Sequence, residues 1–200
     1  MLMRLCTIVL LVLASLRVNA ASVTGVIIAN EAASSPAVNV AAVDQIQTTS
    51  RSGLTDLGSV GGAQNQMEET RREFEESLKT YRELAKKEPE TYLPHVAITL
   101  NNLGIFDSDK NQMNKARMEY EEALKIYREL AQKEPETYLP YVAATLNNLG
   151  ILDRAQNRPE EARKAFEKAM KIYEDFAKQD PDQFSPLVER MKNLLKHLPK

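Results

Sequence analysis

Cysteine and histidine are scarce in this 200-residue sequence, and their scarcity excludes several classes of protein. The only cysteine is Cys6, so no disulfide can form within the chain. The two histidines, His95 and His197, lie far apart, and neither has an evident partner for acid–base chemistry or for metal binding. No glycine-rich phosphate loop occurs either. We therefore predict no catalytic residues, no cofactor and no metal site, and we do not expect an enzyme.

The first twenty residues have the pattern of a secretory signal peptide. Arg4 precedes an apolar stretch at residues 6–16, and Val18 and Ala20 occupy the small-residue positions before a cleavage site. The apolar stretch is shorter than the roughly 20 residues that span a bilayer. Cleavage after Ala20 removes the only cysteine. We expect a secreted mature chain without thiols, which suits any compartment that does not demand disulfides, including the cytosol of another cell.

An excess of basic charge is also absent. Removal of residues 1–20 leaves 24 basic against 28 acidic residues. Proteins that bind nucleic acid carry a clustered basic face that attracts phosphate, so nucleic acid is not an expected partner. We expect no membrane attachment after signal cleavage, and the expected partner is a protein or peptide.

Aromatic residues are missing between residues 21 and 66. This stretch has four charged residues and contains five of the seven glycines of the chain. It cannot bury enough apolar surface to offset its conformational entropy, so we predict a disordered linker. From Met67 onward the chain is charged and rich in Glu, Lys, Ala and Leu, and it contains all twelve aromatic residues. We place the folded domain at residues 67–200.

A repeat with a period of 46 residues organises the folded domain. Residues 81–126 align with residues 127–172, and 30 of the 46 aligned positions are identical. The phrase PETYLPHVAITLNNLG at residues 89–104 recurs as PETYLPYVAATLNNLG at residues 135–150. A fixed period of this length indicates stacked supersecondary units that bury their apolar faces against one another.

The spacing of apolar residues predicts two helices in each unit. A proline is tolerated in the first turn of a helix, so we expect the first helices to begin at Pro94 and Pro140. The preceding long helices should end at Pro89, Pro135 and Pro181. The full repeats then span residues 94–133 and 140–179. A half repeat at residues 67–87 precedes them, and a capping helix at residues 185–198, with Ser185 as N-cap, follows.

Small and aromatic residues recur twice in a pattern that resembles the tetratricopeptide-repeat signature: Leu103, Gly104, Ala116, Tyr120 and Ala123, then Leu149, Gly150, Ala162, Phe166 and Ala169. The long period and the phrase VAxTLNNLG are similar to the kinesin-light-chain subtype. The chain departs from the family in having Asp107 and Asp153 where Tyr is usual, and in exceeding the usual period of about 34 residues. The resemblance implies an all-α, right-handed superhelix of six helices in antiparallel hairpins with a concave peptide-binding groove, and it implies no enzymatic activity.

The resemblance also implies that the first helix of each hairpin lines the groove. Asparagine is a poor helix former, so the paired asparagines in these helices need an explanation. An amide donates and accepts hydrogen bonds and therefore matches the backbone of an extended peptide. The alternative is that one Asn of each pair bonds across the seam between repeats and never contacts a ligand. The groove candidates are Asn101, Asn102, Asn147 and Asn148, with Ile98, Ile105, Ala144 and Ile151 as apolar floor.

The order of signal peptide, linker and helical domain resembles that of oomycete effectors that enter host cells. Those effectors carry Arg-x-Leu-Arg and, further on, acidic residues ending in Glu-Glu-Arg. This chain has a degenerate form in which the leucine is displaced by one place and the second arginine is missing. The alternative is plain linker, because so short a motif arises by chance. The candidate translocation residues are Arg51, Leu54, Glu68, Glu69 and Arg71.

These observations together predict a secreted virulence protein that binds a host protein, in the host cytoplasm or nucleus, and suppresses defence or cell death. The alternative is an extracytoplasmic tetratricopeptide scaffold protein of a bacterium. Whether the array forms a homo-oligomer through its end helices stays open.

Overall fold

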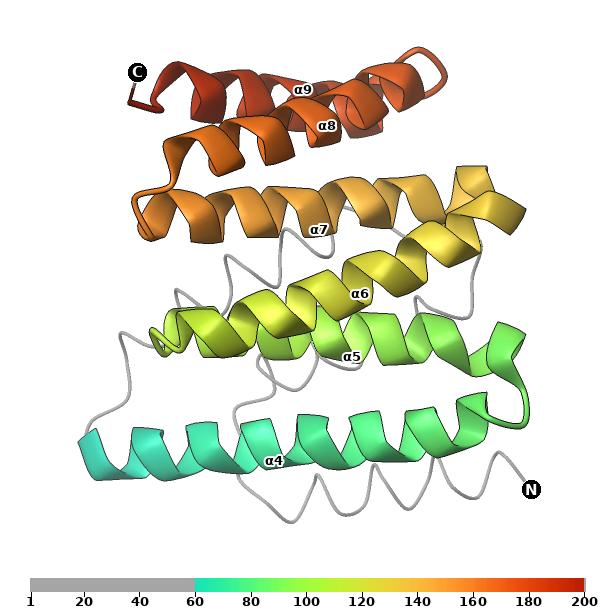
Figure 1. Ribbon diagram of the computed structural model, residues 1–200, viewed down its shortest axis with the longest axis vertical. Coiled ribbons are helices and arrows are strands. Elements are labelled where there is room, and N and C mark those ends of the chain that lie inside the picture. The colour runs from blue at the N-terminus through green and yellow to red at the C-terminus, as the bar shows by residue number, and fades with distance from the viewer. Residues whose placement is uncertain (1–59, 200) are drawn as a thin grey trace.

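Six α-helices make up the part of the chain that the computed structural model describes, residues 60–199. They are α4 (Val60–Ala85), α5 (Pro89–Asp109), α6 (Met113–Lys133), α7 (Pro135–Ala155), α8 (Pro159–Ala177) and α9 (Pro181–Lys196). Each helix packs on the next one along the chain (Figure 1). No strand occurs within residues 60–199, so the expected all-α array of helix hairpins is confirmed. The predicted signal peptide and linker residues 21–59 lie outside the described residues.

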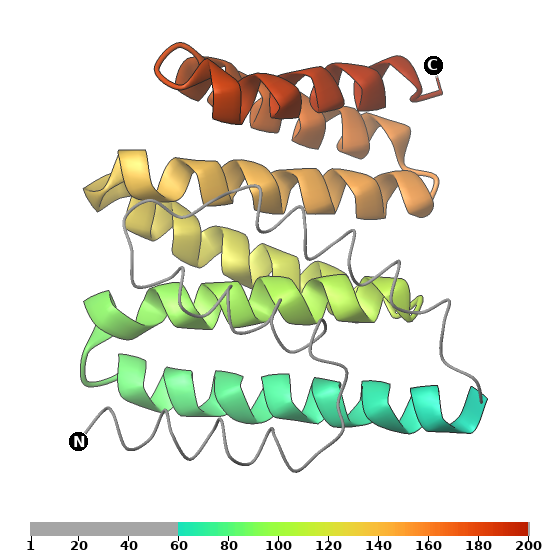
Figure 2. The same cartoon turned by 180° about the vertical axis from the view of Figure 1, so that it is seen from behind.

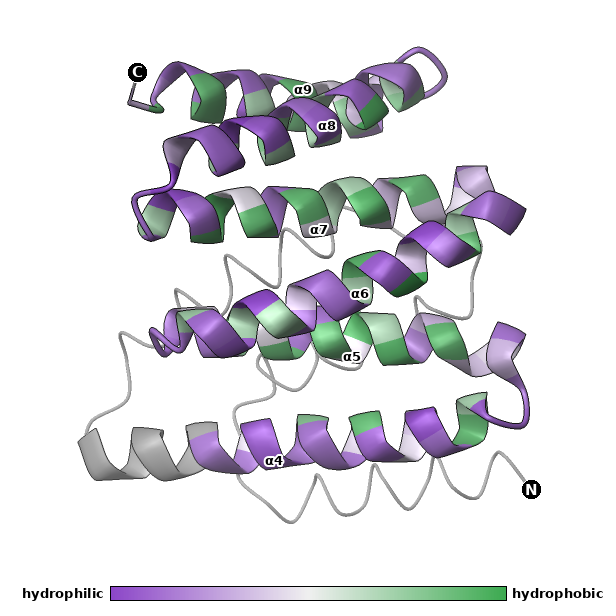
Figure 3. Cartoon of the chain, viewed as in Figure 1, coloured by the Kyte–Doolittle hydropathy of each residue, from purple (hydrophilic) through white to green (hydrophobic). Residues whose placement is uncertain are grey.

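The helices lie in two layers, which Figures 1 and 2 show from opposite sides. The second helices of the repeat units, α4, α6 and α8, form one layer. The first helices, α5, α7 and α9, form the other, in which α5 also packs on α7. Hydrophobic residues dominate α5 and α7 (Figure 3), and residues 141–150 of α7 are all buried. The core therefore lies between the layers, with α7 at its centre.

The first helices begin five residues earlier than the sequence analysis predicts. The prolines expected to end the long helices instead occupy the first position of the following helix: Pro89, Pro135 and Pro181. Pro94 and Pro140, the predicted helix starts, are buried inside α5 and α7. A proline at the first position costs no hydrogen bond, whereas one in the interior does. The extra turn is kept because it brings Tyr92 within 6.5 Å of Tyr81, measured between ring centroids.

Two further predicted boundaries are wrong. The N-cap of the last helix is Asp180 instead of Ser185, and Asp180 Oδ1 accepts a hydrogen bond from the Gln183 N–H at 3.1 Å. This side-chain cap satisfies a backbone donor that the helix start leaves without a partner. Helix α4 begins at Val60, seven residues before Met67, so residues 60–66 of the predicted linker are helical.

A glycine allows the two helices of each hairpin to approach closely. A Cβ atom added to Gly104 would lie 2.6 Å from Cε1 of Tyr120, and one added to Gly150 would lie 2.5 Å from Cε1 of Phe166. Real Cβ atoms essentially never come that close. The described glycines have no positive φ. The need for glycine therefore comes from packing against the ring and not from backbone conformation.

Helix α9 differs from α5 and α7 because it lacks this glycine. Lys196 occupies the position 46 residues after Gly150. Glu189 and Lys192 replace two buried apolar residues of α7, and both are exposed. Glu189 Oε1 accepts a hydrogen bond from Lys192 Nζ at 2.7 Å. A further helix on this face would have to bury these charges, which is costly unless they are well paired.

Candidate functional site

The seam between α5 and α7 uses one asparagine from each repeat. Asn101 and Asn148 are 7% and 4% exposed. Asn148 Nδ2 donates a hydrogen bond to Asn101 Oδ1 at 3.1 Å, and Thr145 Oγ1 lies 3.5 Å from the same oxygen. A buried amide left without a partner costs about 1–3 kcal/mol, so this pairing joins the two repeats. For Asn101 and Asn148 the alternative reading of the sequence therefore holds: they bond to each other between repeats.

Asn147 repeats Asn101 but lacks its partners. The residues at the corresponding positions of α9 are Met191 and Leu194, where α7 has Thr145 and Asn148. Neither can donate the hydrogen bond that Asn101 Oδ1 receives. Among the described residues, Asn147 Oδ1 is accordingly buried without a hydrogen-bond partner.

Asn102 is the asparagine best placed to meet a ligand. It corresponds to Asn148, but no first helix precedes α5 among residues 60–199, and Asn102 is only half-buried. Ile98 lies one turn earlier on the same helix face and is also half-buried. Ile151 is half-buried in α7, whereas Ile105 is 9% exposed and belongs to the core.

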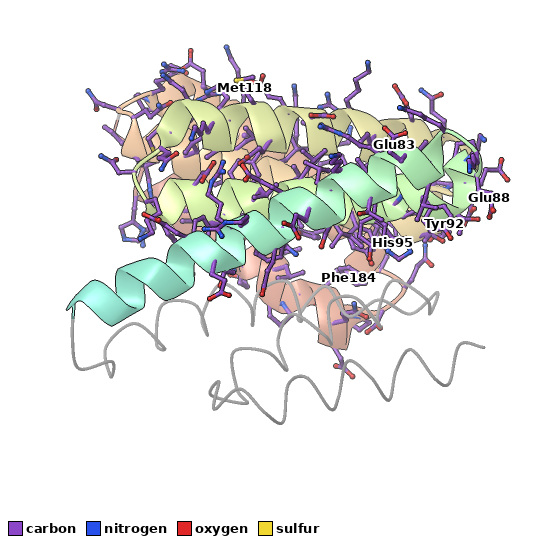
Figure 4. All side chains as sticks on the ribbon, turned by 90° about the horizontal axis from the view of Figure 1, so that it is seen from below. Glu83, Glu88, Tyr92, His95, Met118 and Phe184 are labelled. Carbon is purple, nitrogen blue, oxygen red and sulfur yellow. The ribbon has the colours of Figure 1, made fainter. Side chains whose placement is uncertain are left out.

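Aromatic rings in contact, some stacked and some tilted, join each second helix to the next first helix. Apolar spacing alone assigns these positions to the core. In the first set, the His95 ring centroid lies 5.0 Å from that of Tyr81 and 6.1 Å from that of Tyr92. Figure 4 shows Tyr92, His95 and Phe184 on the side opposite the exposed Met118. The rings therefore lie on the side of the molecule formed by the first-helix layer, α5, α7 and α9. The other two sets are Tyr127, Tyr138 and Tyr141, and Tyr173, Phe176 and Phe184.

Acidic conditions should destabilise the array through His95. Burial lowers the pKa of His95, so the folded state favours the neutral ring. Its contribution to stability is present above the ordinary histidine pKa and is lost as the pH falls through the lowered value. We expect the melting temperature to drop less between pH 7 and pH 5 in His95→Tyr, which copies Tyr141, than in the wild type. His197→Gln serves as the control and should follow the wild type, and equal slopes for all three proteins would contradict the prediction.

An arginine–aspartate pair joins each second helix to the next first helix, and the aspartate takes the position where the family signature has tyrosine. We call the contact of α4 with α5 the first seam and that of α6 with α7 the second seam. Arg71 of α4 donates to Asp107 of α5 through Nε at 2.9 Å and through Nη2 at 3.0 Å. Arg117 of α6 donates through Nη2 alone to Oδ1 of Asp153 in α7, and the same Nη2 lies 3.0 Å from Gln156 Oε1. The Asp107 and Asp153 side chains are 0% and 6% exposed. Charge-assisted bonds of this kind repeat every 46 residues and fix each second helix on the next first helix.

The third copy of this arginine has no carboxylate to bind. Arg163 of α8 corresponds to Arg71 and Arg117, but the position that follows in the pattern is Pro199. Arg163 Nη2 donates instead to the carbonyl oxygen of Pro199 at 3.4 Å. This long bond takes the place of the ion pair between α8 and the residues that follow α9.

Glu119 adds a second carboxyl group to the first of these ion pairs. Burial and the negative charge of Asp107 raise the pKa of Glu119 to about 8. Its Oε1 lies 3.9 Å from Arg71 Nη2, but Arg71 is already bound to Asp107 and does not offset the raised pKa. Both effects favour the protonated form of Glu119. The counterpart of Glu119 in the second repeat is Ala165, so only one of the two seams has this group.

Alkaline conditions should weaken the first seam. The folded-state pKa of Glu119 lies above its ordinary value, so its contribution to stability is present at low pH and is lost as the pH rises through about 8. We expect the free energy of unfolding of the wild type to fall between pH 7 and pH 9, and that of Glu119→Ala to fall less. Urea unfolding at several pH values measures this difference. A fall of equal size in both proteins would contradict the prediction.

The translocation candidates fall into three groups. Arg51 and Leu54 lie outside the described residues. Glu68 and Glu69 are exposed on α4. Arg71 is held by Asp107 and also bonds Glu75. Arg117 takes the same position in the next repeat and also pairs with an aspartate. Arg71 therefore has a structural role that is independent of translocation.

Within residues 60–199, no three His, Cys, Asp or Glu side chains are grouped so as to hold a metal ion. In the same part of the chain, none of the helices combines the length and apolar character that a membrane crossing requires.

Comparison with known families agrees with this architecture. Residues 95–175, from α5 to α8, match the family model described as Tetratricopeptide repeat. No curated protein matches the chain. The match and the two-layer stack of helix hairpins confirm the expected fold, an all-α tetratricopeptide-repeat superhelix. Arrays of this kind bind protein or peptide partners in general and are typically non-catalytic scaffolds.

Proposed function

We propose that this tetratricopeptide array binds an extended segment of a partner protein along the layer of α5, α7 and α9. The observation that carries the proposal is the half-buried pair of Ile98 and Asn102, one turn apart on α5. An amide can bond the backbone of an extended peptide, and an isoleucine beside it offers contact to apolar side chains. The ligand that fits this chemistry is an extended peptide with apolar side chains.

Two of the four asparagines provide a matched test of this proposal. Asn102→Ala should leave the melting temperature unchanged and weaken the capture of partner proteins from host lysate. Asn101→Ala should lower stability by about 1–3 kcal/mol, because it removes the oxygen that accepts the buried hydrogen bond from Asn148 Nδ2. Met118→Ala, a change on the opposite layer, should affect neither. If Asn102→Ala captures the same proteins as the wild type with equal affinity, this face of α5 is not the binding site.

We further propose that the chain is secreted and acts as an effector inside a host cell, where its binding suppresses defence or cell death. The signal-peptide pattern of residues 1–20 supports secretion. It also contains the only cysteine, so the mature chain needs no oxidising compartment and suits a cytoplasm or nucleus. The degenerate translocation motif supports entry into host cells less strongly, because the ion pair with Asp107 already explains the presence of Arg71.

Delivery is tested separately from binding. A fusion of residues 1–66 to a reporter should be secreted and should then enter plant cells. The same fusion with Arg51→Ala and Leu54→Ala tells whether these two residues contribute to entry. A reporter that is secreted but stays outside the cells would contradict the effector role and favour an extracytoplasmic scaffold.

A further inference from the structure

The turns that lead from each second helix to the next first helix lie at one end of the stack (Figure 1). At each turn an acidic residue precedes the proline that begins the first helix, and another follows that proline. All six of these residues are exposed: Glu88, Glu90, Glu134, Glu136, Asp180 and Asp182. Negative charge therefore recurs with the repeat at this end of the first-helix layer.

The start of α5 shows what such a carboxylate binds. Glu90 Oε1 accepts a hydrogen bond at 2.9 Å from Nζ of Lys133, the last residue of α6. The hydrogen bond and the charge of Lys133 lower the pKa of Glu90. A carboxylate in the first turn also interacts favourably with the helix dipole, but this does not prevent Glu90 from binding an ammonium group. The lysine thus joins the turn before α7 to the start of α5.

The start of α7 lacks this cation. Glu136 takes the position of Glu90, 46 residues later, but Gln179 takes the position of Lys133 and carries no charge. Within residues 60–199, no lysine or arginine side chain bonds the carboxylate of Glu136. Glu136 therefore keeps the charge of Glu90 without its partner.

The surroundings of Glu136 add further negative charge. Residues 134–136 and 174–182 together contain six carboxylates and one lysine, whereas the whole chain has a net charge of only −2. The lysine, Lys178, already donates a hydrogen bond to Asp175 Oδ1 at 2.7 Å. A concentration of one sign of charge attracts a segment of the opposite sign and sets its orientation.

Glu136 also offers a main-chain acceptor. In a regular helix its carbonyl oxygen would accept a hydrogen bond from the N–H four residues later, but that residue is Pro140, which has no N–H. A carboxylate and a carbonyl oxygen on one residue can both bond a guanidinium group, which has five N–H donors. An ammonium group is a compact point charge, so arginine suits this residue better than lysine.

We propose that an arginine-rich segment of a partner protein binds the N-terminal ends of α7 and α9, with one arginine on Glu136 in the place that Lys133 takes on Glu90. Asp180 and Asp182 bind further arginines of the same segment. A single exposed ion pair contributes little, so the segment needs several basic residues. This inference goes beyond the proposed function, because it gives the partner a charge and leaves the binding face of α5 uncovered.

Titration of the full chain with a fluorescein-labelled peptide of alternating arginine and glycine tests the proposal by fluorescence anisotropy at low salt. The acidic variant, Glu136→Gln with Asp180→Asn and Asp182→Asn, should bind this peptide at least about tenfold more weakly than the wild type. Asparagine at residue 180 keeps the cap of α9.

A control variant removes the same charge from exposed positions of the second helices. It combines Glu76→Gln, Glu160→Gln and Glu167→Gln. Its affinity for the peptide should fall by less than about twofold, because these residues lie away from the acidic turns. An equal loss of affinity in the acidic and control variants would overturn the proposal.

A pair of lysine variants provides the second measurement. Gln179→Lys supplies the missing counterpart of Lys133, which should bind Glu136 and weaken the peptide about threefold or more. Asn114→Lys adds the same charge at an exposed position near the start of α6, at the other end of the stack, and should weaken the peptide less. Equal affinities of these two variants for the peptide would overturn the proposal.

The same titration separates this inference from the proposed function. The peptide offers no apolar side chain to Ile98, so Asn102→Ala should bind it as tightly as the wild type does. A loss of peptide binding in Asn102→Ala as large as that in the acidic variant would place the peptide on α5 and overturn the inference. The capture of partner proteins by Asn102→Ala remains the test of the binding face of α5.

Discussion

Replacement of Gly150 by leucine should destabilise the array by about 3 kcal/mol or more. The new Cβ atom would lie 2.5 Å from Cε1 of Phe166, a residue that is 0% exposed. Additional atoms in a well-packed core usually cost about 1–3 kcal/mol, and more where the neighbours cannot move. Here both partners lie on α7 and α8, in the centre of the array. Denaturant unfolding followed by circular dichroism measures the loss as a lower midpoint.

Two further variants isolate the contact with the ring. Lys196→Leu places the same side chain 46 residues later, at an exposed position of α9, and should leave stability close to that of the wild type. Phe166→Leu combined with Gly150→Leu should recover part of the loss, because the smaller side chain leaves room. An unchanged midpoint for Gly150→Leu, or no recovery in the double variant, would contradict the packing role of the glycine.

The two arginine–aspartate pairs should respond differently to the loss of the aspartate. Asp153→Ala leaves Arg117, whose side chain is 23% exposed, without its buried carboxylate partner. Breaking a buried pair in this way costs about 3 kcal/mol. Asp107→Ala should cost less, because Glu119 lies 3.9 Å from Nη2 of Arg71 and can release its proton to take the place of Asp107. The pKa of Glu119 should fall in that variant.

A double variant decides whether Glu119 is the reason for the difference. Asp107→Ala combined with Glu119→Ala copies the second seam, where Ala165 stands, and should lose about as much stability as Asp153→Ala. Urea unfolding at pH 7 gives the free energies of unfolding of the wild type, the two single aspartate variants and the double variant. If Asp107→Ala alone is as unstable as Asp153→Ala, Glu119 does not substitute for Asp107.

The 46-residue period predicts the hairpins, their order and the identity of most core residues. It does not place the helix starts, because the phrase PETYLP contains two prolines and either suits the first turn of a helix. Local preference favours Pro94, which costs no hydrogen bond at a helix start. The structure keeps the bond-breaking proline in the interior because the earlier start packs Tyr92 beside Tyr81 and His95. A contact between two helices therefore decides a boundary that local sequence leaves ambiguous.

The candidate site shows the same limit. Four asparagines stand out from sequence alone, but their roles depend on which residue faces which across a seam. Once the bond from Asn148 to Asn101 is known, a shift of 46 residues to Leu194 explains why Asn147 differs from Asn101. The seam ion pairs were missed for a related reason. Arg71 and Arg117 recur with the period, but their partners lie 36 residues away on another helix.

The repeated seam contacts also bear on how such a gene could change in length. Duplication of the 46 codons for residues 88–133 would insert one hairpin after Lys133. Each of the two resulting junctions would again join an arginine to an aspartate and an asparagine to an asparagine. Addition at the C-terminal end would instead meet Lys196, which occupies the glycine position. Unequal recombination within the gene could therefore lengthen the binding surface without any compensating substitution, while terminal extension would need several.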